Sequence, residues 1–393
     1  MKRCVNSVLR ACLLVGPLAA TPAYAATVAV GSCLPNRVSF DSISDAVQGV
    51  PPGSTIQVCP GIYREQVVID KPMTIRGVAS GNSSNPVIAL PAGGAVANAA
   101  ALNAGPSFFG TGQLIAAQVY VQAGLDVTIT DISIDGAGAS MAVCNNPVLV
   151  GVLVQDSSLT LNRIAIRNQL QLTPVVCGNV GVLAQNDSLN PTLVKVQNST
   201  FVDAGQAYEG DGASLTSMLT SSSFAGNPAN NANAVSILTG NSTVQANTIS
   251  NYRYPPAAND VNGAAYGIFL TCVPGGTIAN NTIATTQAGI FLSNPNCPTT
   301  GVSITNNKVS DAEVIGIDVG QTNGLVQGND IRTSRTAIRI PGAAAGNIIQ
   351  NNLINDACAA IGSNPAAGAN TLLGNTISNV LNLSLVNTTA LCP

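Results

Sequence analysis

Short runs in which apolar and polar residues alternate recur along most of the chain. One phrase places an apolar residue two positions after an asparagine, and its copies are Asn247–Ile249, Asn281–Ile283, Asn307–Val309, Asn329–Ile331, Asn352–Ile354 and Asn375–Ile377. The closest copies lie 22 or 23 residues apart, and we interpret wider intervals as the same repeat carrying a loop. Because alternation over a few residues is typical of β-strands, each repeat is predicted to hold several short strands.

A second phrase, in which glycine or alanine precedes an alternating strand, runs in step with the first. Its copies include Gly151–Val154, Gly181–Ala184, Gly267–Leu270, Gly289–Leu292, Gly316–Val319 and Ala337–Ile340. Strands this close together leave no room for a crossover helix, which excludes a βαβ array. One turn of a parallel coil per repeat remains, with apolar side chains buried by stacking on the next turn. We therefore predict an all-β, right-handed single-stranded parallel β-helix, a solenoid of roughly 11–13 coils.

The ends of the solenoid are also predicted from the pattern. Apolar residues form one face of a short helix over residues 40–48, which would cap the first coil. The recurring asparagines are interpreted as a hydrogen-bonded ladder along the axis rather than as ligand contacts. Residues 26–393 then form one β-helix domain, with 26–77 as the N-terminal cap and first coils and 355–393 as the C-terminal cap.

The strands of the second phrase also predict a row of outward side chains. In coil order this row is Leu153, Leu183, Ser236, Phe269, Phe291, Asp318 and Arg339. Phe269 and Phe291 would stack on the outside, which requires either a covering loop, such as residues 254–266, or a ligand. Asp318 and Arg339, one coil apart, are predicted to form a surface ion pair worth less than about 1 kcal/mol.

The N-terminal segment has the pattern of a secretory signal peptide. Three basic residues, Lys2, Arg3 and Arg10, accompany an apolar stretch over residues 11–20, and Ala23–Ala25 is an A-x-A cleavage site. The apolar stretch is too short to span a bilayer. We expect cleavage near Ala25 and a secreted or periplasmic product that does not insert into a membrane.

Composition narrows the function classes. Removing residues 1–25 removes three basic residues and no acidic residue, which leaves 12 basic against 18 acidic side chains. Nucleic acids require a basic face on the protein, so they are excluded as partners. We separately expect a monomer. The chain has no histidine and no C-x-x-C motif, which argues against a zinc site or a thiol-redox site.

The cysteines suggest an exported, disulfide-bonded protein. Ten are present, and cleavage would remove Cys4 and Cys12. The eight others form pairs close in sequence, and four disulfides are expected. These pairs are Cys33/Cys59, Cys144/Cys177, Cys272/Cys297 and Cys358/Cys392.

The segment 42–77 resembles the opening of pectin methylesterases and of the pectin-lyase-like β-helix superfamily. The resemblance rests on Ile43–Val47, Pro52–Val58, Pro60–Glu65, Val67–Ile69 and Met73–Gly77. The later coils resemble parallel β-helix repeats of periplasmic copper-processing and carbohydrate-binding proteins. These resemblances imply the fold, but the methylesterase motifs are absent: Gln155-Asp156-Ser157 stands nearest the Gln-Asp-Thr motif, and nothing matches Asp-Phe-Ile-Phe-Gly. The polygalacturonase pattern requires a histidine that this chain lacks.

Candidate chemistry gathers in enlarged repeats that are interpreted as loops walling a groove. Carboxylates could act there as acid and base, and tyrosines could stack on sugar rings. The candidate catalytic residues are Asp203, Glu209, Asp211 and Arg253. The candidate substrate-binding residues are Tyr208, Tyr252, Tyr254, Asp260, Phe269 and Phe291. Alternatively, Asp203, Glu209 and Asp211 hold Ca²⁺, or these residues are ordinary solvated turns.

Three functions follow. The first is a secreted β-helix that binds a polysaccharide or a cell-surface glycan. The second is a polysaccharide lyase or glycoside hydrolase acting on pectin-like or other uronate-containing glycans. The third is a non-catalytic structural surface protein. The absence of histidine and tryptophan and the low charge favour a binding protein, with no cofactor other than the alternative of Ca²⁺.

Overall fold

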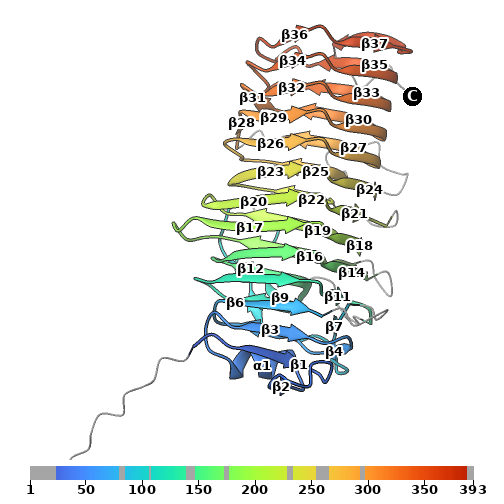
Figure 1. Ribbon diagram of the computed structural model, residues 1–393. Coiled ribbons are helices and arrows are strands. Elements are labelled where there is room, and N and C mark those ends of the chain that lie inside the picture. The colour runs from blue at the N-terminus through green and yellow to red at the C-terminus, as the bar shows by residue number, and fades with distance from the viewer. Residues whose placement is uncertain are drawn as a thin grey trace, which may run out of the picture.

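The protein is a stack of β-coils along one axis (Figure 1). The computed structural model describes residues 24–78, 85–105, 108–138, 147–171, 177–227, 233–253, 265–292 and 297–386. Most of the predicted signal peptide lies outside these residues, so it remains a prediction. Among the described residues, no helix is long and apolar enough to cross a membrane.

Each coil contributes strands to three columns. The first column is a parallel sheet with one strand per coil, and its thirteen described strands agree with the predicted 11–13 coils; the short strand β2 is added at its N-terminal edge. They are β1 (Thr27–Val30), β3 (Thr55–Val58), β6 (Met73–Gly77), β10 (Asp126–Thr130), β13 (Ser158–Asn162), β17 (Thr192–Gln197), β20 (Leu215–Thr220), β23 (Asn241–Gln245), β26 (Gly276–Ala279), β29 (Val302–Thr305), β32 (Leu325–Gln327), β34 (Ile348–Gln350) and β36 (Thr371–Leu373).

The second column follows the asparagine turn of each coil. Its separate strands are β4 (Ile62–Arg64), β7 (Val87–Ala89), β11 (Ser133–Asp135), β14 (Ala165–Gln171), β18 (Thr200–Ala204), β21 (Ser223–Ala225), β24 (Thr248–Tyr252) and β37 (Thr376–Ser378). Four longer strands supply its other members and continue into the third column: β27 (Thr282–Leu292), β30 (Lys308–Val319), β33 (Asp330–Ile340) and β35 (Leu353–Ser363).

The third column completes each coil. It contains β5 (Val67–Ile69), β9 (Leu114–Val121), β12 (Val148–Gln155), β16 (Val180–Gln185), β19 (Gln206–Asp211), β22 (Val235–Ile237), β25 (Tyr266–Leu270) and β38 (Asn382–Val386), besides the second halves of the four long strands. Short additional strands are β2 (Ser39–Phe40), β8 (Ala99–Ala100), β15 (Cys177–Gly178), β28 (Thr299–Thr300) and β31 (Gln321–Thr322).

The corner between the second and third columns is made by residues in the left-handed region. In the long strands these are Thr285, Asp311, Thr333 and Asp356, with φ between 51° and 54°. In earlier coils Asn168, Asp203 and Asn251 occupy the same corner. Asparagine and aspartate tolerate positive φ better than most residues, so a polar residue recurs here for a backbone reason.

The core is a set of apolar stacks, as the repeat predicted. Ile249, Ile283, Val309 and Ile331 pair in register across successive coils and are at most 1% exposed. Phe201 and Phe224 stack in the same column of the core, with ring centroids 4.8 Å apart. The predicted superposition of these apolar residues is confirmed.

The asparagines form a continuous ladder inside the turn between the first two columns. The side-chain amide of each donates to the side-chain oxygen of the next at 2.9–3.0 Å, from Asn247 through Asn281, Asn307, Asn329 and Asn352 to Asn375. The same side chains also bond buried backbone groups, as when Asn329 donates to the Ile304 carbonyl. The structural interpretation of the asparagines is confirmed.

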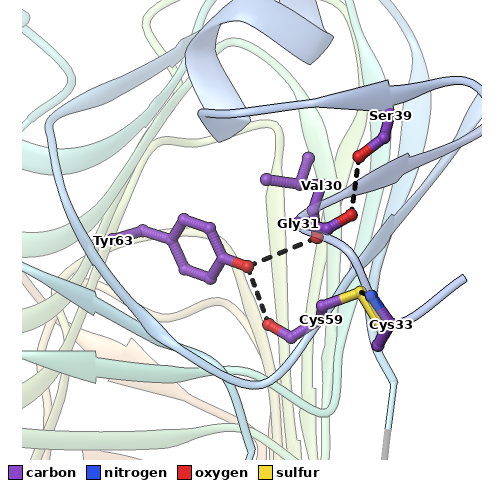
Figure 2. Close-up of a disulfide and its surroundings, with 6 residues drawn as sticks. All are labelled: Val30, Gly31, Cys33, Ser39, Cys59 and Tyr63. Atoms are coloured by element: carbon purple, nitrogen blue, oxygen red, sulfur yellow. Dashed lines mark hydrogen bonds between the residues drawn. A yellow bond between two sulfur atoms is a disulfide. The ribbon is translucent and has the colours of Figure 1, made fainter.

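The N-terminal cap is the helix α1 (Ile43–Gly49), which lies across the end of the stack (Figure 1). Ser42 caps it, because its hydroxyl accepts from the Asp45 N–H at 3.0 Å. The Glu65 carboxylate accepts from the backbone N–H groups of Ile43 and Ser44 at 2.9 and 2.8 Å. Tyr63 donates to the Cys59 carbonyl at 2.9 Å (Figure 2). The residues behind the methylesterase resemblance therefore build the cap.

Two predicted disulfides are present, Cys33–Cys59 (Figure 2) and Cys272–Cys297. Cys358 is also disulfide-bonded. Cys144, Cys392 and the side chain of Cys177 lie outside what the structure describes, so their pairing remains a prediction. The C-terminal cap also stays a prediction, because residues 387–393 lie outside the described ranges.

The ladder gives a direct test of what stabilises the coils. Asn329→Ala removes a side chain that satisfies buried groups on both sides, so we expect a loss of about 2–4 kcal/mol in the free energy of unfolding. Urea unfolding followed by circular dichroism measures it. The control is Asn241→Ala, an exposed asparagine on β23, which should change stability by less than about 0.5 kcal/mol. Similar losses for both variants would contradict a structural ladder.

Candidate functional site

The outward face of the third column, here named the third-column face, carries one row of side chains along the axis. The register places Tyr120, Leu153, Leu183, Glu209, Ser236, Phe269, Phe291, Asp318 and Arg339 on successive coils. The predicted row is therefore correct, with Glu209 as an additional member between Leu183 and Ser236. Successive members are separated by about 4.8 Å, the spacing of paired strands.

One segment lies over the N-terminal half of this face. We name residues 98–105 and 108–113, which lie between β7 and β9, the strap; β8 pairs antiparallel with β9 at its base. Its described contacts reach Gln155 on β12, Gln185 on β16 and Glu209 on β19. At its far end, the Phe108 ring lies 6.1 Å from the Phe269 ring. The strap thus follows the axis across several coils.

Beneath the strap lie two carboxylates of β19. Glu209 and Asp211 are both fully buried and stand on the same face of the strand, about 7 Å apart along it. Glu209 accepts from the Gln206 amide at 2.9 Å and from the Phe108 N–H at 3.3 Å. Asp211 accepts from the Thr239 hydroxyl at 3.0 Å, and burial raises the pKa of its carboxyl.

Asp211 is only partly satisfied. Its Oδ2 atom is buried and has no hydrogen-bond partner among the described residues. Gly105 of the strap lies directly against its other oxygen. Burying a carboxylate oxygen without a partner lowers the free energy of unfolding. Such a group in a folded protein therefore calls for a structural or functional explanation.

Residues 203–212, which include this pair, were predicted to form a loop, and this prediction is wrong. Residues Gln206–Asp211 form β19, because Tyr208 and Gly210 face the core while Glu209 and Asp211 face outward. The alternation of a strand places the two carboxylates together on one face.

Other predicted site residues are separated from this pair. Asp203 occupies the corner between columns, where φ is 53°, and the side-chain amide of Asn227 donates to it at 3.4 Å. Arg253 lies at the same corner further along and forms ion pairs with Asp311 at 3.2 Å and Glu313 at 3.7 Å. Neither residue joins the carboxylates beneath the strap. The described residues contain no group of three or more acidic or cysteine side chains arranged to hold a metal, so the calcium alternative gains no support.

Two of the three tyrosines predicted to stack on sugar rings are core residues. Tyr208 and Tyr252 are fully buried in the core, which leaves neither ring accessible to a ligand. The Tyr208 hydroxyl donates to Ser217 inside the coil at 2.7 Å. Their inward positions on β19 and β24 override the preference of tyrosine for a surface. Tyr254 and Asp260 lie outside the described residues, so their roles remain predictions.

The predicted outward stack of phenylalanines is present and larger than expected. Tyr266 stacks on Phe291 at 4.4 Å and on Phe269 at 5.3 Å between ring centroids. Phe108 of the strap joins the same row beside Phe269 and is 53% exposed. Tyr266 and Phe291 are buried, and Phe269 is half-buried. The exposed surface of this aromatic row is therefore supplied by Phe108 and Phe269.

An ion pair ends the row. The Arg339 guanidinium lies 5.2 Å from the Phe291 ring centroid, and its Nε donates to Asp318. Asp318 is fully buried, whereas Arg339 is 21% exposed, so the predicted surface ion pair is wrong about its environment. Burial raises the pKa of the Asp318 carboxyl to about 6, although Arg339 opposes this shift.

Sequence reasoning missed the strap and, with it, Phe108. The interval between Val87 and Leu114 lacks the repeat and was not recognised as a covering segment. A signal was nevertheless present: the third-column face carries Gln155 and Gln185 beside Leu153 and Leu183, a mixed surface that needs both apolar cover and backbone hydrogen-bond partners.

The buried Asp318 predicts a specific pH dependence. The carboxyl pKa is about 6 in the folded chain against 3.8 ordinarily, so the folded state binds the proton more tightly. Stability of the wild type relative to Asp318→Asn should therefore fall on the order of 2–3 kcal/mol as pH rises from about 4 to about 6, then stay level. Urea unfolding of both proteins across this range measures the difference. A difference independent of pH would contradict the assignment.

Comparison with solved structures finds several proteins that share this fold. A lacto-N-biosidase of GH136 from Eubacterium ramulus is 10% identical, with a TM-score of 0.60, and the match covers 90% of this chain and 68% of that one. The A-module of mannuronan C-5 epimerase AlgE4 from Azotobacter vinelandii is 14% identical, with a TM-score of 0.52 and coverage of 88% and 91%. A DFA-IIIase from Arthrobacter chlorophenolicus A6, without its lid and in complex with GF2, is 16% identical, with a TM-score of 0.57 and coverage of 90% and 98%.

At these identities the likeness shows the fold alone. No curated protein sequence matches the chain. A family model described as the right handed beta helix region matches residues 150–354, which is more than half of the chain. The match agrees with the pectin-lyase-like resemblance of the N-terminal segment, and the chain belongs to the right-handed β-helix family.

Proposed function

We propose that this protein is an exported β-helix that binds a polysaccharide along the third-column face. The observation that carries the proposal is the aromatic row, whose exposed rings are Phe108 and Phe269. Further along the same row the Arg339 guanidinium is fixed over the Phe291 ring, which lies next to Phe269. Aromatic faces stack on the apolar faces of sugar rings, and a guanidinium donates hydrogen bonds to their oxygens.

The direction of the row supports a polymer as the ligand. Phe269, Phe291 and Arg339 lie on a line parallel to the axis, with about 4.8 Å per coil. Arg339 is held in place by the buried Asp318 and by the Phe291 ring, so little freedom is lost when it binds. The three carbohydrate-active neighbours support a saccharide as the ligand class, and the disulfides support export.

The half-buried ring of Phe269 gives the sharpest test. We expect Phe269→Ala to bind its polysaccharide about tenfold more weakly, because one stacking surface is lost. Isothermal titration with fragments of pectin, alginate and xylan measures the affinity. Val202→Ala is the matched control, since Val202 is also partly exposed but lies on the second column. If both variants bind like the wild type, the aromatic row is not the binding site; if no glycan binds, a purely structural role is favoured.

Cleavage of a glycan is a second candidate function, favoured by the carboxylate pair of β19. Glu209 and Asp211 share one face of β19, about 7 Å apart along the strand, and burial raises the pKa of Asp211, as a general acid requires. The strap covers both carboxylates in this structure, so cleavage requires the strap to move away from them.

Cleavage is tested by product analysis on the same three polymers. If the chain is an enzyme of this kind, Glu209→Gln and Asp211→Asn should each lower the rate by about 10²–10⁴-fold. Asp126→Asn, an exposed aspartate on β10, should leave the rate unchanged. Full activity in both carboxylate variants would remove the pair from the mechanism.

A further inference from the structure

We infer that one water molecule is bound beneath the strap, between the side chains of Gln185 and Asp211, and completes a polar ladder along the third-column face. The ladder runs through the last residues of three successive strands, Gln155 on β12, Gln185 on β16 and Asp211 on β19. The inference concerns the covered part of this face, so it goes beyond the proposed binding at the aromatic row and does not depend on it.

The first rungs of this ladder are direct hydrogen bonds. The Tyr120 hydroxyl donates to the Gln155 side-chain oxygen at 2.8 Å, and the Gln155 amide donates to the Gln185 side-chain oxygen at 3.2 Å. The strap supplies a further donor, because the Leu102 N–H bonds the same Gln185 oxygen at 3.1 Å. That oxygen therefore has one donor for each of its two lone pairs. These bonds fix the orientation of the Gln185 amide, since turning it over would place its NH2 group against two donors.

The next rung has a donor and an acceptor but no direct bond between them. Gln185 and Asp211 pair in register on β16 and β19, and both are at most 2% exposed. Within the part of the chain that the structure describes, Gln185 Nε2 has no acceptor and Asp211 Oδ2 has no donor. Two neighbouring side chains thus lack partners of opposite kinds, which marks a position where a third group can satisfy both.

The bonds already made leave the two unpartnered atoms on facing sides. Gln185 Oε1 is bonded to the preceding coil through Gln155, and Asp211 Oδ1 is bonded to the following coil through the Thr239 hydroxyl at 3.0 Å. Gln185 Nε2 and Asp211 Oδ2 are consequently the atoms directed toward the interval between β16 and β19, whose spacing is about 4.8 Å. The group that joins them must accept from an amide and donate to a carboxylate.

The chemistry of the two atoms excludes charged groups. A cation could bind Asp211 but cannot accept the Gln185 N–H, and among the described residues no three acidic or cysteine side chains are arranged to hold a metal. Protonation of Asp211 would add a second donor and leave the Gln185 N–H without an acceptor. A small neutral hydroxyl group meets both requirements.

The strap decides which hydroxyl group fits. A Cβ atom on Gly105 would come within 2.8 Å of Asp211 Oδ1 and 3.3 Å of the Thr239 methyl group, so the strap backbone rests directly on these side chains. This leaves no room for a sugar ring beside Asp211. Water is the hydroxyl of the right size, and buried waters in proteins typically join polar groups that have no other partner.

The bound water explains why a carboxylate with an unpartnered oxygen is tolerated at this place. Through it the ladder becomes continuous from Tyr120 on β9 to Thr239 beyond β22. A hydrogen bond from water to Oδ2 stabilises the ionised form of Asp211 and opposes the effect of burial, which raises the pKa of this carboxyl. The site therefore ties the strap, through Leu102 and Gln185, to the carboxylate beneath it.

A crystal structure of the full chain tests the site directly. An ordered oxygen atom should lie about 2.7–3.2 Å from both Gln185 Nε2 and Asp211 Oδ2. The density should show neither the coordination nor the anomalous signal of a metal ion. A direct hydrogen bond between the two side chains, a metal ion, or no density between them would each overturn the inference.

Substitution of Asp211 tests the same site in solution. Asp211→Leu removes the acceptor of the water and leaves Gln185 and Thr239 without partners, so the Tm in a calorimetric scan should fall by about 2–5 °C. If Asp211 were an isolated buried carboxylate, the same substitution would remove an unfavourable group and raise the Tm. A Tm that is unchanged or raised would overturn the inference.

Two further variants keep the test decisive. Asp211→Asn retains an oxygen that can accept from the water, so its Tm should fall less than that of Asp211→Leu and its crystal should retain the water. Loss of the water from the folded Asn variant would contradict the inference even if the Leu variant does not fold. The matched control is Ser242→Ala, which removes another buried oxygen without a partner and should leave the Tm unchanged or slightly raised.

Discussion

Parallel pairing between successive coils is the constraint on which the rest of this structure depends. A single coil is too thin to bury its own apolar side chains, so each one buries them only against its neighbours at about 4.8 Å. Ile249, Ile283, Val309 and Ile331 stack for this reason, and the asparagine ladder satisfies the buried backbone groups beside them. The capping helix α1 is needed because the first coil has no preceding neighbour.

Because of the same pairing, outward side chains of successive coils lie in straight rows along the axis. Residues at equivalent positions of successive coils point outward in line, so a few substitutions per repeat create a binding surface of any length. On the third-column face this row changes character along the axis, from leucines to carboxylates, then aromatic rings, then an ion pair. A linear surface of this kind is suited to a linear ligand, which connects the fold to the proposed polysaccharide.

The strap changes what that row can do. It covers the leucines and both carboxylates of β19 and ends at the aromatic rings. In the second half of the row Phe269 and Arg339 keep exposed surface, whereas Phe291 and Asp318 are buried. Burial also changes the chemistry of the acidic residues, since it raises the pKa of both Asp211 and Asp318. One part of the row therefore attaches the strap, and the proposed function assigns ligand contact to the exposed side chains of the other part.

The sequence by itself determined the coil, the register of its core, the capping helix and two of the disulfides, because these depend on a local repeat that recurs at 22–23 residues. It also determined which residues share the outward row, since alternation along a strand decides which side each residue faces. Only the tertiary structure decided which of those residues are accessible. Tyr208 and Tyr252 proved to be core residues, Asp203 and Arg253 proved to be corner residues, and Asp318 proved to be buried. These positions depend on where each coil turns and on pairing between coils, as between Asp318 and Arg339. Glu209 and Asp211 are covered by the strap, a non-repeating segment whose contacts join residues about 80 to 100 positions apart, and no local pattern records such contacts.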